Sequence, residues 1–133
     1  MNKFGRASLK NLSSADHRFE ELSRIVLKIK DHSIIKGHRG QVEQDKAYAS
    51  GASELFWPNG KHNRFPSLAI DVQTYPRPDD KQDLREEQLY LLGLYKGIGY
   101  LMGIRIRTGA DWDNDGEIAD NGFDDFFHVQ IDE

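Results

Sequence analysis

The sequence predicts a single domain that contains both helices and strands. Its 133 residues are 38% hydrophobic and 30% charged, which suits one soluble globular domain with one sizeable core. Apolar side chains recur at spacings of three and four within residues 15–30 and again over residues 84–102, as on the face of a helix. Over residues 67–75 they alternate with other residues, as in a half-buried strand. We therefore expect residues 1–133 to form one domain.

The first half of the chain predicts a helix, a strand and a second helix. The first helix covers residues 15–30, and Ser14 can cap it. Its apolar face consists of Phe19, Leu22, Val26 and Ile29. The segment HSIIK predicts a short strand, and the glycine-bracketed turn GHRG leads from it into a helix over QVEQDKAYASG. Arg39 is thereby expected at a strand-to-helix junction.

The middle of the chain predicts a loop followed by a strand with two different faces. Residues 54–66 are rich in Pro, Gly and Asn, which is typical of a loop. In the strand SLAIDVQTY, Ala69, Asp71 and Gln73 share the face opposite the apolar residues. A carboxylate within such a strand costs several kcal/mol to bury unless it is paired or bound to a metal. A buried salt bridge between Asp71 and Arg39 is the alternative to metal binding.

The last part of the chain predicts a long helix over residues 84–102 and then two strands. The first strand lies at GIRIRTG, and an acidic loop over residues 111–125 separates it from the closing strand FFHVQI. The alternation of this last strand places His128 and Gln130 on one face. Gln130 is expected either to orient neighbouring groups or to face water.

The composition excludes several classes of protein. The chain has 18 Lys+Arg and 22 Asp+Glu, a net charge of -4, without the concentrated basic surface that nucleic-acid binding needs. It has no cysteine, so a transition-metal site must use His and carboxylates. No stretch approaches the roughly 18 apolar residues of a membrane span, and the first twenty residues lack the apolar core of a secretory signal. We expect no nucleic-acid partner, no membrane partner and no Sec export.

Three side chains form a candidate zinc-binding set: His62, Asp71 and His128. Zinc hydrolases commonly use three His or carboxylate ligands and leave a fourth position for water. Asp125 stands three residues before His128, where it can accept a proton from that water and pass it to a leaving amine. Arg39 can bind a substrate carboxylate or steady an oxyanion, and Gln44 can orient the peptide.

Two segments, GKHNRFPSLAIDV and FDDFFHVQI, resemble the signatures of M15 peptidases, a family that includes D-Ala-D-Ala carboxypeptidases and phage L-alanyl-D-glutamate endolysins. His62, Asp71, Asp125 and His128 occupy the positions of the family pattern. The segment GHRGQVEQDKAYASGAS resembles the upstream part of the family, which carries over Arg39 and Gln44. Two features depart from the pattern: Gly60 replaces a frequent Ser, and the spacer from His62 to Asp71 is longer.

The resemblance implies an α+β fold, with a small antiparallel sheet and helices packed on one side, as in D-Ala-D-Ala peptidases and hedgehog-type domains. It also implies a monomeric zinc endolysin that hydrolyses the L-Ala-D-Glu bond of peptidoglycan stem peptides and reaches the wall from the host cytoplasm through a holin. Two alternatives stay open. One is a D,D-peptidase with the same metal site, and the other is a non-catalytic module that binds the wall or a protein.

The acidic loop predicts a calcium site. Asp111, Asp113 and Asp115 stand at positions 1, 3 and 5 of the first half of an EF-hand loop, followed by Gly116. The carbonyl group of Glu117 is expected to add a ligand. Because the bidentate Glu of position 12 is missing, either Asp120 or Asp124 is expected to complete the shell. Calcium is then expected to order the loop and regulate activity. The alternative is a solvated acidic loop.

Overall fold

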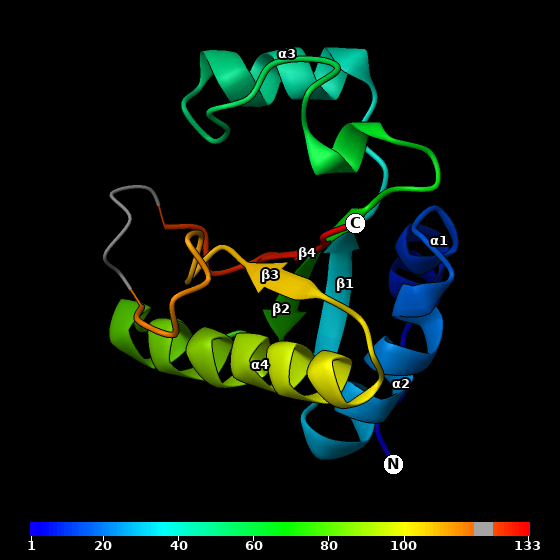
Figure 1. Ribbon diagram of the computed structural model, residues 1–133. Helices are drawn as coiled ribbons and strands as arrows, with labels where there is room; N and C mark the ends of the chain where they lie inside the picture. The colour runs from blue at the N-terminus through cyan, green and yellow to red at the C-terminus, as the bar shows by residue number, and fades with distance from the viewer. Residues whose placement is uncertain (119–123) are drawn as a thin grey trace.

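The computed structural model describes residues 1–118 and 124–133 (Figure 1). Its centre is an antiparallel sheet with the strand order β1-β2-β4-β3. The strands are β1 (His32–Lys36), β2 (Ala69–Thr74), β3 (Ile106–Thr108) and β4 (His128–Ile131). All four lie where the alternation patterns predict strands. The α+β class and the antiparallel sheet are thereby confirmed.

Helices cover one side of this sheet. The described helices are α1 (Arg6–Ser13), α2 (Arg18–Ile29), α3 (Gln41–Ala49) and α4 (Lys81–Leu101), with a short 3₁₀ turn η1 (Lys61–Asn63). In Figure 1, α2 and α4 lie below the sheet and α1 lies beside β1, as predicted for helices on one side. The exception is α3, which lies above the sheet with the loop that follows it. None of the described helices combines the length and apolar character needed to cross a membrane.

Two details of the first helix prediction are wrong. Ser14 ends α1 instead of capping α2, and its hydroxyl group accepts a hydrogen bond from the amide of His38. Ile29 is 52% exposed, because α2 ends there. The sequence patterns also missed α1, which has only one buried apolar residue, Leu12.

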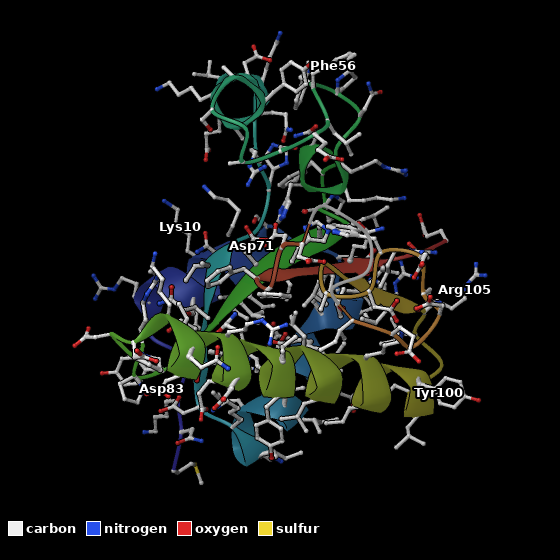
Figure 2. The ribbon with its side chains drawn as sticks, turned by 90° about the vertical axis from the view of Figure 1, so that its left-hand side faces the viewer. Lys10, Phe56, Asp71, Asp83, Tyr100 and Arg105 are labelled. Carbon is white, nitrogen blue, oxygen red and sulfur yellow. The ribbon has the colours of Figure 1, made fainter. Side chains whose placement is uncertain are left out.

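The core lies between the sheet and the helices below it. Its residues come from every strand and include fully buried side chains of α2 and α4: Phe19, Leu22, Val26, Leu91 and Tyr95. Ile70 and Val72 turn into this core from β2, so Asp71 must point to the other face of the sheet. Figure 2 shows Asp71 between the sheet and α3, on the side that α4 does not cover.

Candidate active site

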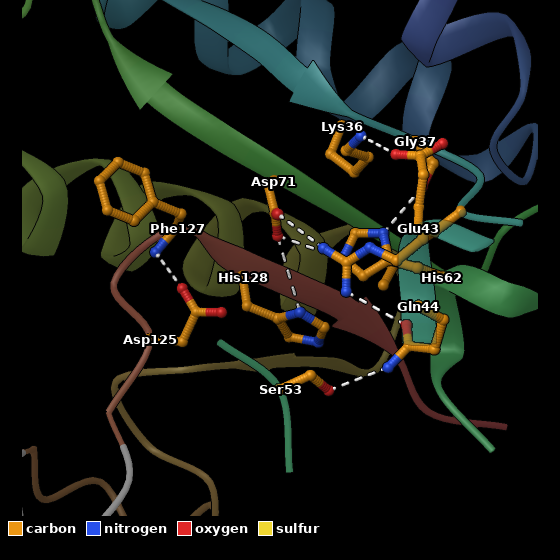
Figure 3. A network of polar contacts seen from close by, with 12 residues as sticks. Lys36, Gly37, Glu43, Gln44, Ser53, His62, Asp71, Asp125, Phe127 and His128 are labelled. Carbon is orange, nitrogen blue, oxygen red and sulfur yellow. Dashed lines mark hydrogen bonds and ion pairs between the residues drawn. The ribbon is translucent and has the colours of Figure 1, made fainter. Parts of the chain in front are cut away.

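The three predicted metal ligands converge on the open face of the sheet (Figure 3). Asp71 and His128 are directly opposite each other in the β2–β4 register, and His62 comes from η1. The distance from His62 Nε2 to Asp71 Oδ1 is 3.1 Å, and that from His128 Nδ1 to the same oxygen is 3.7 Å. One donor atom from each residue lies within 4.8 Å of the other two. The strand pairing and η1 therefore bring together residues that are far apart in sequence.

The donor set fits a zinc ion in chemistry and in spacing. Bonds of about 2.0–2.2 Å arranged tetrahedrally place two ligand atoms about 3.3–3.6 Å apart. The two separations from Asp71 Oδ1, 3.1 and 3.7 Å, lie just below and just above this range, so small shifts would accommodate the ion. Two imidazoles and one carboxylate are also a ligand set that zinc hydrolases use. The residues form a candidate metal-binding site.

The outer nitrogen of each histidine is held by the protein. His62 Nδ1 lies 2.7 Å from the carbonyl oxygen of Gly37, and His128 Nε2 lies 2.8 Å from Oε1 of Gln130. The amide nitrogen of Gln130 in turn donates to Asp132, at 2.9 Å. Such bonds fix the orientation and tautomer of a ligand histidine. They leave His62 Nε2 and His128 Nδ1 directed toward Asp71. Gln130 faces His128, as the alternation predicts.

The charges at this site suit a cation. Burial alone would raise the pKa of the Asp71 carboxyl, but the two histidines and Arg39 outweigh burial and hold that pKa below its ordinary value. Burial and the neighbouring His62 lower the pKa of His128 to about 4. Near neutral pH Asp71 is thus ionised and His128 is neutral, which are the states in which these side chains bind a metal.

Asp125 lies at the entrance to β4 in a position that its backbone contacts define. Its amide donates to the carbonyl oxygen of Gly109, at 2.9 Å, and its Oδ1 accepts from the amide of Phe127, at 3.0 Å. A Cβ at position 109 would lie 1.9 Å from the Asp125 carbonyl oxygen, so only glycine allows this approach. Burial, and then the negative charge of Asp71, raise the pKa of the Asp125 carboxyl. A raised pKa suits a group that accepts and returns a proton.

Arg39 borders the same site, between β1 and α3 as predicted. Its Nη1 donates to Oε1 of Gln44, at 3.2 Å, and its Nη2 lies 3.9 Å from Asp71 Oδ2. Gln44 is only 1% exposed, and its amide nitrogen donates to Ser53 and to the carbonyl oxygen of Leu55. These contacts occupy Gln44 within the protein. Gln44 also lines a cavity beside the candidate ligands. Its contacts favour a role in holding Arg39.

Gln88 on α4 supports the backbone segments that carry Asp71 and Asp125, and the sequence patterns did not indicate this role. Its side chain is fully buried and hydrogen bonds only to backbone groups: it accepts from the amide of Thr74 and donates to the carbonyl oxygens of Val72 and Phe126. It thereby ties the residue after Asp71 to the residue after Asp125. The available signal was a polar amide within the apolar periodicity of residues 84–102.

A cavity of about 350 Å³ opens beside the candidate ligands. Its walls include His62, His128, Asp125 and Arg39, together with Trp112. The indole ring of Trp112 lies 5.0 Å from the imidazole of His128, measured between centroids. The sequence patterns give no signal for Trp112, because aromatic residues near loops more often cover a core. Its place in the cavity wall makes it part of the site's surface.

The acidic loop brings Asp111, Asp113 and Asp115 together, with one oxygen from each within 4.8 Å of the others. Asp111 Oδ2 also accepts from Lys96 Nζ, at 3.0 Å, and its carboxylate accepts from the amides of Asp115 and Gly116. The amide of Glu117 donates to Asp115 Oδ1, at 2.8 Å. Asp120 lies outside the described residues.

Comparisons with known proteins agree on one group. The family model for phage L-alanyl-D-glutamate peptidase matches residues 1–131. The L-alanyl-D-glutamate peptidase of Escherichia phage T5 is 28% identical over 136 residues, covering 97% of each chain. The crystal structure of Serratia marcescens L-Ala D-Glu endopeptidase ChiX matches with a TM-score of 0.74 at 17% identity, covering 98% of this chain and 91% of that one, which shows a shared fold. Because the family model spans nearly the whole sequence, the chain belongs to the phage L-alanyl-D-glutamate peptidase family.

Proposed function

We propose that this protein is an endolysin that hydrolyses the L-Ala-D-Glu bond of peptidoglycan stem peptides with a zinc ion. The observation that carries the proposal is the position of Asp125 in the wall of the cavity that His62 and His128 also line. A proton-accepting carboxylate beside a metal-ligand set is what a metallopeptidase requires. Family membership and the names of the two similar proteins supply the bond that is cut.

Each side chain then has a defined task. Zinc held by His62, Asp71 and His128 would acidify a water molecule and polarise the scissile carbonyl. Asp125 takes a proton from the attacking water and returns it to the leaving nitrogen. The raised pKa of Asp125 lowers the cost of the protonated state between these two transfers.

Arg39 supplies the positive charge on the substrate side. A guanidinium can donate two parallel hydrogen bonds to a carboxylate. We propose that it binds the α-carboxylate of D-Glu, which is only one carbon atom away from the scissile nitrogen. Gln44 contributes by holding Nη1 of Arg39.

The test is hydrolysis of purified peptidoglycan by metal-replete protein, with the new amino termini identified by mass spectrometry. Wild type is compared with His128→Ala and with chelator-treated protein. We expect new D-Glu amino termini that depend on zinc and on His128. Free D-Ala would instead identify a D,D-peptidase. Absence of cleavage by a folded, zinc-loaded protein would support a non-catalytic binding module.

Calcium regulation is a separate part of the proposal. The three aspartates of the acidic loop support it, because their oxygens converge and the loop leads into Asp125. Bound calcium would order this connection between β3 and β4. The test compares hydrolysis rates in excess EGTA, after zinc is restored, with rates in added calcium. Equal rates would refute calcium regulation and leave the peptidase assignment intact.

We also propose that the enzyme acts as a monomer and reaches the wall through a holin. Sedimentation equilibrium at micromolar concentration tests the first statement, and a mass of one chain is expected. Expression in a bacterial host with and without a holin tests the second. Lysis is expected only with the holin, and lysis without it would contradict this route.

A further inference from the structure

A second cavity borders the catalytic residues from the other side. It has a volume of about 600 Å³ and shares Arg39, Ala52 and Asp125 with the first cavity. Asp71 lines the second cavity, whereas His62 and His128 line the first. The candidate reacting centre therefore lies between the two cavities. A peptide cut in its interior continues on both sides of the scissile bond, so an endopeptidase needs space on both sides.

Arg77, in the wall of the second cavity, is an oriented cation with no anionic partner among the residues that the structure describes. Its Nη1 donates to Oε1 of Gln73, at 2.7 Å, and its Cζ lies 5.9 Å from the ring centroid of Phe127. Both contacts are with neutral groups. Within residues 1–118 and 124–133, Arg77 makes no ion pair with a carboxylate, although Asp124 lines the same cavity.

Three other arginines of the chain are paired with carboxylates. Arg18, Arg24 and Arg107 each have a carboxylate partner, at 2.8, 2.6 and 2.8 Å respectively. An exposed arginine that is oriented by an amide and an aromatic ring presents a planar pair of donors to solvent. That is an arrangement suited to binding a carboxylate from outside the protein.

The position of Arg77 indicates which carboxylate of the substrate it can bind. Gln73, its hydrogen-bond partner, is two residues along β2 from Asp71, which corresponds to about 7 Å. The α-carboxylate of D-Glu is one carbon atom from the scissile nitrogen, so a carboxylate farther along the peptide matches this spacing better. The third residue of the stem peptide follows a γ-linked glutamate, so its side chain reaches beyond about 7 Å.

We propose that Arg77 binds the side-chain carboxylate of the third stem-peptide residue where that residue is diaminopimelate, an inference that rests on the proposed function. Diaminopimelate and lysine differ by one carboxylate, and both occur at this position in bacterial walls. Arg77 thereby makes the enzyme prefer diaminopimelate-containing peptides. The second cavity holds the amine side of the scissile bond, and the first cavity holds the acyl side.

The experiment measures kcat/KM of the zinc-loaded enzyme on two otherwise identical stem peptides, one with diaminopimelate and one with lysine at position three. We expect Arg77→Gln to lose about tenfold on the diaminopimelate peptide, the size of one charge-assisted hydrogen bond. On the lysine peptide we expect a change of less than about twofold. The loss should be in KM, because the contact is remote from the reacting atoms.

Arg85→Gln is the matched control. Its guanidinium also lies over an aromatic ring, that of Phe126, at 5.2 Å, but it does not line the second cavity. The same change of charge there should leave the ratio between the two peptides unchanged. Equal losses of Arg77→Gln on both peptides, or no loss on either, would overturn the assignment of Arg77 alone. If the wild type cleaves neither peptide, the proposed function and this inference are overturned together.

Discussion

Two buried histidines of one sheet show how structural and functional roles differ. His32 begins β1 and His128 begins β4. Burial is the first cause that lowers the pKa of each ring, to about 4 in both cases. By burial and by proton affinity the two residues are therefore alike. The difference between them lies in what their ring nitrogens contact.

Among the described residues, both ring nitrogens of His32 have hydrogen-bond partners, whereas His128 has a hydrogen-bond partner at Nε2. His32 Nδ1 lies 2.9 Å from the carbonyl oxygen of Lys30, and its Nε2 lies 2.7 Å from the hydroxyl oxygen of Tyr95. His128 Nε2 bonds to Gln130, but Nδ1 lies 3.7 Å from Asp71, which is too far for a hydrogen bond. A ring nitrogen that faces a carboxylate at 3.7 Å, without a direct hydrogen bond to it, indicates a place for a ligand more clearly than burial does.

The largest effect is expected from replacing each of the two histidines in turn. His128→Ala removes a ligand, so zinc binding and hydrolysis should both fall below detection. His32→Gln should retain both, because His32 contacts only groups of the fold. Zinc content after dialysis and hydrolysis rates check the pair. Loss of zinc from a folded His32→Gln protein would contradict the division of roles.

Asp125→Asn should separate catalysis from metal binding. The amide cannot accept the proton, so kcat is expected to fall about 10²- to 10⁴-fold, the contribution of a general acid-base group. Zinc affinity should stay close to that of the wild type, since Asp125 is outside the ligand set. Steady-state kinetics and a zinc competition titration on the same preparation measure the two quantities. A parallel loss of zinc would show that Asp125 supports the ligands instead of the proton transfers.

The third prediction concerns the hydrogen bond that orients His128. Gln130→Leu removes the acceptor at Nε2, and zinc affinity should fall about 10- to 100-fold, as for other groups that orient a ligand histidine. Gln130→Glu keeps an acceptor and should stay near the wild-type value. Tyr95→Phe, the equivalent change beside His32, should leave zinc affinity unchanged. Zinc competition titrations of the three variants rank them directly.

Sequence patterns alone could predict part of this contrast. The alternation in FFHVQI correctly places His128 and Gln130 on one face, and the strand around Asp71 marks its carboxylate as unusual. His62 lies in a loop without periodicity, so residue type alone made it a candidate, and the family resemblance then supported it. No local pattern distinguishes His32 from His128, because each begins a strand beside apolar residues. The distinction arises from tertiary contacts, with Tyr95 in one case and Asp71 in the other.

The same limit applies to two buried amide side chains near the candidate site, Gln88 and Gln44. Gln88 belongs to a helix that follows β2 in sequence, yet its amide bonds to the backbone on both sides of the site. Helical periodicity marks it as facing the core but says nothing about which backbone groups it meets there. Gln44 was expected to orient the substrate, but its amide is engaged by Arg39, Ser53 and Leu55. Hydrogen-bond partners of buried amides depend on the assembled fold.

The last prediction concerns stability instead of activity: the free energy of unfolding should depend on pH through His32. The native state holds its pKa near 4, below the ordinary value of 6.5, so the unfolded chain binds more protons between these values. Stability is then fully present above about pH 6.5 and is lost as pH falls toward 4. A pKa lowered from 6.5 to about 4 corresponds to about 3 kcal/mol in the free energy of unfolding.

Urea unfolding of the wild type and of His32→Gln at several pH values between 7 and 4 isolates this contribution. His128 titrates equally in both proteins, so its effect cancels in the difference between them. The wild type should lose about 3 kcal/mol more than the variant over this range. Parallel pH curves would mean that the neutral form of His32 is not what the native state selects, and the two histidines would then differ in proton affinity as well as in their contacts.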